Sequence, residues 1–198
     1  IMIGMELAGI GNALMDVISV VETEFISSLG IYNNSVSHVP HDKLEEILVF
    51  LPEPMFMAGG GALNVARVAS MLGIPSGFAG STGSDSFGTL IQDELQLAGV
   101  DAWISPKPGP TGIFISLGTP DGKRTVIVST GVADQLSETD IPDAFFEAGS
   151  TLHMEGFMAW REDFFMSCLE RAARSGMLIS LDASSRSLIE KRHSLFIE

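Results

Sequence analysis

The chain is poor in cysteine and in basic residues, and each shortage excludes a class of protein. Cys168 is the only cysteine among 198 residues, so no internal disulfide can form, and we expect a reducing compartment, the cytoplasm. It lies in a helical pattern with no histidine nearby, which favours a buried apolar role over a catalytic thiol. Acidic residues outnumber basic ones 25 to 11, a formal net charge of −14, and the basic residues form no cluster. Because polyanion binding needs a basic face, we expect neither nucleic acid nor an anionic membrane as a partner.

Long apolar runs and the common nucleotide-binding loops are missing as well. No run reaches the roughly 18 apolar residues of a membrane span, and the first residues lack the basic flank and apolar core of a secretion signal. A dinucleotide fingerprint starting at Gly9 would place its third glycine at Leu14, whose side chain blocks close helix packing. The pair Gly122-Lys123 is followed by Arg124, so it does not form a Walker A loop. A dinucleotide-dependent oxidoreductase is therefore a weak alternative.

What the chain does contain is an alternation of strand and helix signals, which is typical of an α/β architecture. Strand patterns cover residues 6–14, 76–80, 151–155 and 177–182. Helical patterns cover residues 23–29, 42–51, 62–72, 84–98 and 162–175. The helix over 84–98 begins with Ser84 or Asp85, either of which can serve as its N-cap.

One region interrupts the alternation. Two β-rich runs, 112–118 and 123–128, flank a Pro-Asp-Gly turn and predict a hairpin. A hairpin cannot belong to a simple parallel stack, so we expect a small antiparallel flap, joined by the segments 16–21 and 35–39. Flaps attached to α/β sheets commonly cover a ligand and exclude water.

Three consecutive glycines, Gly59 to Gly61, run directly into the helical pattern that contains Asn64. Such a junction lets backbone N–H groups approach a ligand without obstruction by a Cβ atom, and it adds the positive end of a helix dipole. The segment therefore suits an oxygen-rich ligand, either a hydroxylated substrate or a phosphate. A flexible loop before an ordinary core helix is the alternative, and the glycines alone leave both open.

Several motifs together resemble a known family. Three segments occur in a characteristic order: GIGNALMD (9–16), AGGGALN (58–64) and AGSTGSDSFG (79–88). With the Thr111-Gly112 pair before the hairpin and the strand over 152–156, they resemble the N-terminal signature region of the ribokinase-like carbohydrate kinases, the PfkB family. The resemblance extends over essentially the whole chain.

The resemblance implies a three-layer, Rossmann-like α/β ribokinase fold with a small antiparallel β-sheet lid. Residues 1–198 would form one domain that is incomplete at its C-terminus, with lid segments at about 16–39 and 101–130. The implied activity is ATP-dependent phosphorylation of a sugar hydroxymethyl group. Alternatives are an adenosine or other nucleoside kinase of the same family, and a non-catalytic sugar-binding module.

The resemblance also implies a set of substrate-binding residues. They are Asn12, Asp16, Gly60, Gly61, Asn64 and Glu155. A carboxylate such as Asp16 can accept two hydroxyl donors at once, which discriminates polyols strongly. The glycines would present backbone groups to the sugar, and Asn64 would add its amide.

Each of these polar residues also has a purely structural interpretation. Asn12 and Asp16 are residue types that cap turns, and Asn64 could cap its own helix. Glu155 could be a carboxylate at the edge of a loop. Asp182 follows the last strand pattern and could lie near a phosphate, although we favour an N-cap of a helix that begins near residue 184.

The family's second signature, Asp-Thr-x-Gly-Ala-Gly-Asp, has no match in the chain. The resemblance implies that this signature supplies the catalytic base and an anion hole and that it would lie beyond residue 198. We therefore expect the acceptor-substrate half and lid of a longer kinase, inactive alone, with no metal ligand in this chain. ATP and Mg²⁺ are the implied cofactors, and their main binding segments would also lie in the missing part. Family members often pair their lids, so the resemblance also implies a homodimer.

Overall fold

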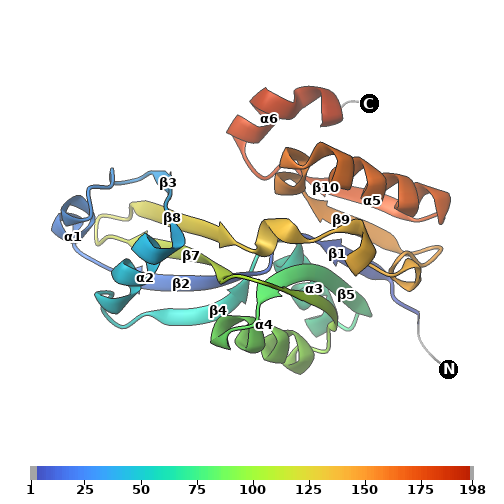
Figure 1. Ribbon diagram of the computed structural model, residues 1–198, viewed down its shortest axis with the longest axis horizontal. Helices are drawn as coiled ribbons and strands as arrows, with labels where there is room; N and C mark the ends of the chain where they lie inside the picture. Colours follow the sequence, from blue (N-terminus) through green and yellow to red (C-terminus); the bar gives the residue numbers. More distant parts are fainter. Residues whose placement is uncertain (1–3, 197–198) are drawn as a thin grey trace.

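The computed structural model describes residues 4–196 and contains two five-stranded sheets (Figure 1). The first is parallel throughout, with strand order β10-β9-β1-β5-β6. Its strands are β1 (Leu7–Ile10), β5 (Ser76–Gly83), β6 (Asp101–Lys107), β9 (Thr151–Glu155) and β10 (Leu178–Asp182). The strand patterns over 76–80, 151–155 and 177–182 are thereby confirmed.

Helices cover both faces of the parallel sheet, which makes the three layers that the resemblance implied. Neighbouring residues of β5 show this, because Phe78 and Ala79 are fully buried in two different apolar clusters on opposite faces. The helices α3 (Gly61–Met71) and α4 (Ser86–Leu97) line the Phe78 face, and α5 (Glu162–Arg174) lines the other. The chain continues after β10 into α6 (Arg186–Arg192). Short 3₁₀ helices lie at Ala133–Gln135, Glu138–Asp140, Asp143–Phe145, Gly156–Trp160 and His193–Phe196.

Cys168 lies on the buried face of α5 and is inaccessible to solvent. Burial raises the pKa of its thiol to about 12. The side chain therefore acts as a small apolar residue, as its surroundings in the sequence predicted.

The second sheet, the lid, has the order β3-β8-β7-β2-β4 and extends to the left of the parallel sheet in Figure 1. Its strands are β2 (Leu14–Val20), β3 (Val36–His38), β4 (Met55–Gly59), β7 (Thr111–Gly118) and β8 (Arg124–Gly131). The hairpin β7–β8 is antiparallel as predicted, but β2 pairs with β7, and β3 with β8, in parallel. The lid is thus a mixed sheet, because β2 and β7 each follow directly on a strand of the parallel sheet and leave it in the same direction.

The structure corrects the predicted limits of the lid. The expected segment 101–130 includes β6, which pairs with β5 in the parallel sheet, so this part of the lid begins at Thr111. The strand predicted over 6–14 is likewise two strands, and the chain crosses between the sheets at residues 11–13. Both errors arise because a continuous β-rich run does not show where the chain passes from one sheet to the next. The strand β4 also belongs to the lid and was not predicted.

Two short helices cover one face of the lid. They are α1 (Thr23–Ser28) and α2 (His41–Val49), and both match predicted helices within two residues at each end. Their buried side chains pack against alternate residues of the lid strands, such as Met15 and Val17. Because alternate residues of a strand point to opposite faces, Asp16 lies on the other, uncovered face. None of the helices between residues 4 and 196 combines the length and apolar character needed to span a bilayer.

Candidate functional site

The triglycine bend lies where the lid meets the parallel sheet, since Gly59 ends β4 and Gly61 begins α3. A Cβ atom on Gly59 would overlap the carboxylate of Asp16, and one on Gly60 would overlap the backbone carbonyl of Asn12. Gly60 also has a φ of 122°, in a region that side chains rarely adopt. These glycines therefore allow two of the predicted site residues to approach the bend closely.

The third glycine faces the carboxylate of Glu155, because a Cβ on Gly61 would lie 3.1 Å from Glu155 Oε2. Glu155 ends β9 and is only 2% exposed. Its Oε1 accepts hydrogen bonds from the backbone N–H (2.9 Å) and side-chain Nδ2 (2.6 Å) of Asn12. Its Oε2 accepts a long hydrogen bond, 3.4 Å, from the N–H of Ala62 in the first turn of α3. Burial raises the pKa of Glu155, and these hydrogen bonds oppose the rise.

The N-terminus of α3 is thus occupied by a carboxylate of the chain itself. We expected an oxygen-rich ligand at this helix end, but Glu155 already satisfies the Ala62 amide. Nor is Glu155 a loop-edge carboxylate. It joins the end of β1 to the start of α3 from a third element, β9.

Asn12 does not cap a local turn, since its amide group donates to a residue 143 positions away. Its Oδ1 is buried and has no hydrogen-bond partner among residues 4–196. An unpaired buried acceptor costs roughly 1–3 kcal/mol. The oxygen is therefore an acceptor that a donor from outside the chain could satisfy.

Asp16 lies in the middle of β2, on the uncovered face of the lid, and so does not cap a turn. Its register partners are Phe114 on β7 and Met57 on β4. Burial raises the pKa of Asp16 to about 6, and the positive charges of Arg67 and Arg124 oppose this rise. The carboxylate is therefore ionised above about pH 6 and can then accept hydrogen bonds from hydroxyl groups.

Asn64 lies in the first turn of α3, but its side chain does not cap the helix. Its Oδ1 accepts a hydrogen bond of 2.7 Å from Nη2 of Arg67, one turn further along. The guanidinium of Arg67 also donates to the carbonyl of Ala58, at 3.1 Å. We did not single out Arg67 from the sequence; the available signal was its i, i+3 spacing from Asn64.

A second polar junction at the base of the lid was predicted only as a helix cap. Asp85 is the N-cap of α4 and accepts a hydrogen bond from the N–H of Gly88 (2.8 Å). It also accepts from the hydroxyl (2.6 Å) and the N–H (2.7 Å) of Thr111, the first residue of β7. Burial opposes ionisation of Asp85, but these hydrogen bonds outweigh it and lower its pKa. The Asp85 carboxylate thus joins the start of α4 to the start of β7, the first strand of the hairpin.

Asp182 is not the cap that we favoured. It accepts a hydrogen bond from the N–H of Ser184 (2.8 Å), whereas the N-cap of α6 is Ser185, which accepts from Leu188 N–H. The helix begins two residues later than the sequence suggested, and Asp182 instead stabilises the turn that leads to it.

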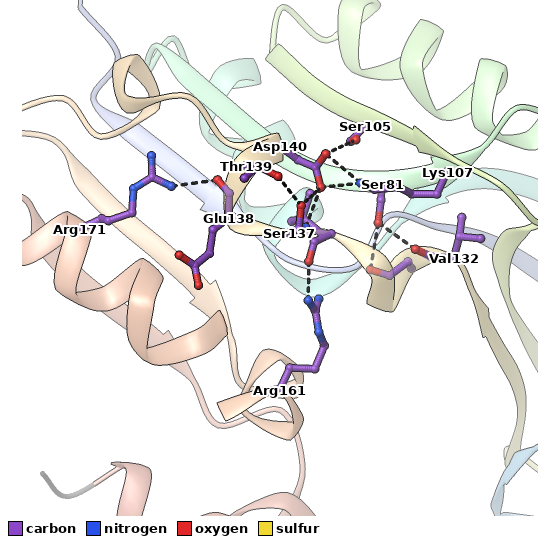
Figure 2. A network of polar contacts seen from close by, with 12 residues as sticks. Ser81, Ser105, Lys107, Val132, Ser137, Glu138, Thr139, Asp140, Arg161 and Arg171 are labelled. Carbon is purple, nitrogen blue, oxygen red and sulfur yellow. Dashed lines mark hydrogen bonds and ion pairs between the residues drawn. The ribbon is translucent and has the colours of Figure 1, made fainter. Parts of the chain in front are cut away.

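A larger polar network fixes the segment that returns from the lid (Figure 2). Asp140 pairs with Lys107 at 2.6 Å, and both Ser105 and Ser137 donate to its carboxylate. Burial opposes ionisation of Asp140, but the hydrogen bonds from Lys107 and Ser137 lower its pKa well below the usual range. Because these charges are already paired within the chain, we assign the network a structural role.

Cavities elsewhere do not coincide with the bend. One of about 490 Å³ lies beside Trp160 and Arg161, and one of about 620 Å³ lies beside Asp85 and Lys107. None of the predicted site residues lines either cavity. Within residues 4–196, no group of three His, Cys, Asp or Glu side chains is placed to hold a metal ion. The candidate site is therefore defined by the contacts around the triglycine bend.

The three-layer parallel-sheet domain with a mixed-sheet lid is the fold of the ribokinase-like family. The chain matches the pfkB family carbohydrate kinase family over residues 23–195, and it belongs to that family.

Among curated relatives, adenosine kinase 2 of Arabidopsis thaliana is 27% identical over 199 residues, which covers 93% of this chain and 56% of that kinase. The ATP-dependent ribose-1-phosphate kinase of Halopiger xanaduensis is 28% identical over 130 residues, or 65% of this chain and 43% of that kinase. The chain thus spans about half the length of the curated relatives that it matches.

Solved structures confirm the fold. A probable sugar kinase protein from Rhizobium etli CFN 42 superimposes with a TM-score of 0.86 at 21% identity, covering 98% of this chain and 61% of that one. The adenosine kinase from Sinorhizobium meliloti gives the same TM-score and coverage at 22% identity.

Proposed function

We propose that the full-length protein transfers the γ-phosphoryl group of ATP to a hydroxymethyl group of a sugar, and that this chain contributes the acceptor-binding half and the lid. One observation carries the proposal. Asp16 from the lid and Asn12 from the end of β1 meet at the triglycine bend, where glycine alone allows them to approach. Membership of the family supports it.

In this proposal each residue has a distinct role. The Asp16 carboxylate accepts two acceptor hydroxyls at once, and the unpaired Oδ1 of Asn12 accepts another. Gly60 and Gly61 present backbone groups, and Asn64 supplies the donors of its amide. Glu155 holds Asn12 in place, since its two oxygens are occupied by the chain.

The proposal places the catalytic base and the contacts to ATP and Mg²⁺ in a part of the protein beyond residue 198. Phosphoryl transfer depends on positioning and on neutralising the γ-phosphate, so we expect the 198-residue chain alone to be inactive. When bound, the metal and nucleotide supply the phosphoryl group and neutralise its charge. The residues of this chain hold the acceptor and, through the lid, exclude water.

A nucleoside acceptor is the second candidate, and one observation favours it. Phe114 lies next to Asp16 in register on the open face of the lid, with the Arg124 guanidinium 5.5 Å from its ring centroid. An aromatic face beside a hydroxyl-binding carboxylate suits a nucleobase attached to a ribose. A non-catalytic sugar-binding module is the third candidate, and no contact among residues 4–196 favours it.

The predicted homodimer through the lid would need the same open face. The opposite face is covered by α1 and α2, so pairing of lids would bring a second copy against Asp16 and Phe114. The dimer stays a prediction, to be checked by the oligomeric state of the full-length protein.

The first test is an ATP-consumption screen of the full-length protein with ribose, fructose, ketodeoxygluconate and adenosine. We expect turnover with a sugar and its loss to below measurable rates in Asp16→Ala, because the acceptor hydroxyl is no longer positioned. The matched control is Asp121→Ala, at an exposed aspartate in the hairpin turn of the same lid, whose side-chain partners within residues 4–196 are Lys123 and the nearby Thr119.

Near-normal turnover in Asp16→Ala would refute the assigned role of Asp16. Turnover with adenosine alone would favour the second candidate, and binding without ATP consumption would favour the third.

A further inference from the structure

Arg67 lies one turn after Asn64 on α3 and is not among the residues predicted to bind the acceptor. Its side chain is 23% exposed and makes hydrogen bonds to two groups around the triglycine bend. They are the side chain of Asn64 and the backbone carbonyl of Ala58.

The contact with Asn64 decides which way its amide points. A guanidinium carries only donors, so the Asn64 atom 2.7 Å from Nη2 must be the carbonyl oxygen. The amide NH₂ group therefore lies on the other branch of the side chain. The hydrogen bond from Arg67 keeps the NH₂ group on that branch, where it can donate hydrogen bonds.

The contact with Ala58 secures the strand that enters the bend. β4 is the edge strand of the lid, so Ala58 has no neighbouring strand on one side. Its N–H donates to Glu94 Oε2 on α4 at 2.9 Å, and its carbonyl accepts from Arg67 Nη1 at 3.1 Å. The two side chains also pair with each other at 3.6 Å. This ion pair therefore takes the place of a neighbouring strand and ties the lid edge to two helices of the parallel-sheet layer.

The charge of Arg67 acts on Asp16. Two cationic side chains oppose the effect of burial on this carboxylate, Arg67 from α3 and Arg124 from β8, and Arg67 contributes more. One residue thus connects the lid edge, the Asn64 amide and the Asp16 carboxylate.

We propose that Arg67 is a positioning residue of the acceptor site, which orients the Asn64 amide, holds the entry to the triglycine bend at Ala58 and thereby keeps its positive charge next to Gly59, the residue that the Asp16 carboxylate approaches. The part of this inference that concerns acceptor binding rests on the proposed function. The parts that concern Asn64 and Asp16 do not.

The test uses the full-length protein with two substitutions. Arg67→Lys keeps the charge but cannot span Asn64 Oδ1 and the Ala58 carbonyl with a rigid fork. Arg67→Met removes both the charge and the fork. The control is Arg174→Met, at a 72% exposed arginine on α5 that pairs with Glu170 in the same helix.

Three measurements separate the effects. The first is the acceptor KM and kcat, the second is the thermal unfolding midpoint, and the third is a carbon-detected NMR titration of the Asp16 carboxyl in the ligand-free protein. We expect Arg67→Lys to raise the acceptor KM about tenfold, equivalent to 1.4 kcal/mol, with a smaller change in kcat and a titration of Asp16 like that of the wild type. Arg67→Met should raise KM further and shift the Asp16 titration to higher pH, while Arg174→Met changes none of these.

The proposal is overturned if Arg67→Lys and Arg67→Met both keep the wild-type KM, or if the Asp16 titration does not move in Arg67→Met. It is also overturned if Arg67→Lys lowers the apparent kcat only in proportion to the folded fraction and leaves KM unchanged, because Arg67 is then merely structural. If the wild type phosphorylates no acceptor, the proposed function fails, and the titration still decides whether Arg67 acts on Asp16.

Discussion

The two sheets of this protein each bring one carboxylate to the triglycine bend, and the two carboxylates differ in what surrounds them. Glu155, from the parallel sheet, is 2% exposed and is bonded by Asn12 and by the start of α3. Asp16, from the lid, is half-buried, lies against Gly59, and the positive charges of Arg67 and Arg124 oppose the rise of its pKa on burial.

The difference shows that one carboxylate of a binding site can stabilise the fold while the other stays available to bind a ligand. A carboxylate whose oxygens are satisfied by the chain stabilises the fold, and it has little capacity left for a ligand. A carboxylate on the open face of the lid, with no hydrogen bond from the described residues, keeps its oxygens available for a ligand. We therefore assign Glu155 to support and Asp16 to binding.

The largest effect should separate the two carboxylates by stability. Glu155→Ala leaves buried donors of Asn12 and Ala62 without an acceptor, and each such donor costs roughly 1–3 kcal/mol. We expect the free energy of unfolding to fall by about 3 kcal/mol or more, measured by urea denaturation. Asp16→Ala removes a carboxylate whose burial is unfavourable, so its stability should stay within about 1 kcal/mol of the wild type.

Glu155→Gln serves as the control, because it keeps one oxygen for Asn12 but turns an NH₂ group toward the Ala62 amide. An intermediate loss is expected. Equal free energies of unfolding for Glu155→Ala and Asp16→Ala would contradict the assignment of a supporting role to Glu155 and a binding role to Asp16.

A second prediction tests whether glycine is required where Asp16 approaches. In Gly59→Ala the new Cβ overlaps the Asp16 carboxylate, while the backbone of Gly59 has no positive φ and tolerates alanine. We expect the acceptor KM to rise about tenfold, or 1.4 kcal/mol, with a smaller change in the unfolding midpoint.

Gly118→Ala in the same sheet is the matched control, because a Cβ there meets no atom within 4 Å. If both substitutions raise KM equally, the effect does not come from displacement of Asp16.

The last prediction concerns pH. The pKa of Asp16 is raised from 3.8 to about 6 in the folded protein, so between these values the folded state binds more protons than the unfolded state. Its contribution to the free energy of unfolding therefore falls as pH rises from about 4 to about 6. Acceptor binding needs the ionised carboxylate and should change in the opposite direction, strengthening as pH rises through about 6.

Asp16→Asn should flatten the stability dependence relative to the wild type, measured by urea denaturation at several pH values. The same slope in Asp16→Asn and wild type would mean that another group titrates in this range.

Motifs with strong local chemistry predicted their elements well. Asp85 caps α4 as its position before the helix suggested, and the Pro-Asp-Gly turn makes the antiparallel hairpin. Most helices and the parallel strands β9 and β10 begin and end within two residues of their predicted limits. In each case the signal is contained in a few neighbouring residues, so it can be read without knowing which distant segments they contact.

The assignment of strands to sheets could not be read in the same way. β6 has the composition of a lid strand but pairs with β5, and β2 pairs in parallel with β7, nearly a hundred residues away. β4 is a Met- and Phe-rich edge strand without a regular alternation, and it was not predicted at all. Which strands pair with each other depends on where the chain passes from one sheet to the other, and the sequence of a strand does not indicate that position.

The sequence by itself determined the α/β class, the glycine junction and the identities of the polar residues around it. The tertiary structure alone decided that the oxygens of Glu155 accept hydrogen bonds from Asn12 and from the start of α3. It alone also decided that Arg67 links Asn64 to the lid edge. The physical reason is the directionality of hydrogen bonds. Which donor satisfies which acceptor depends on positions brought together from distant parts of the chain, and local patterns do not contain those positions.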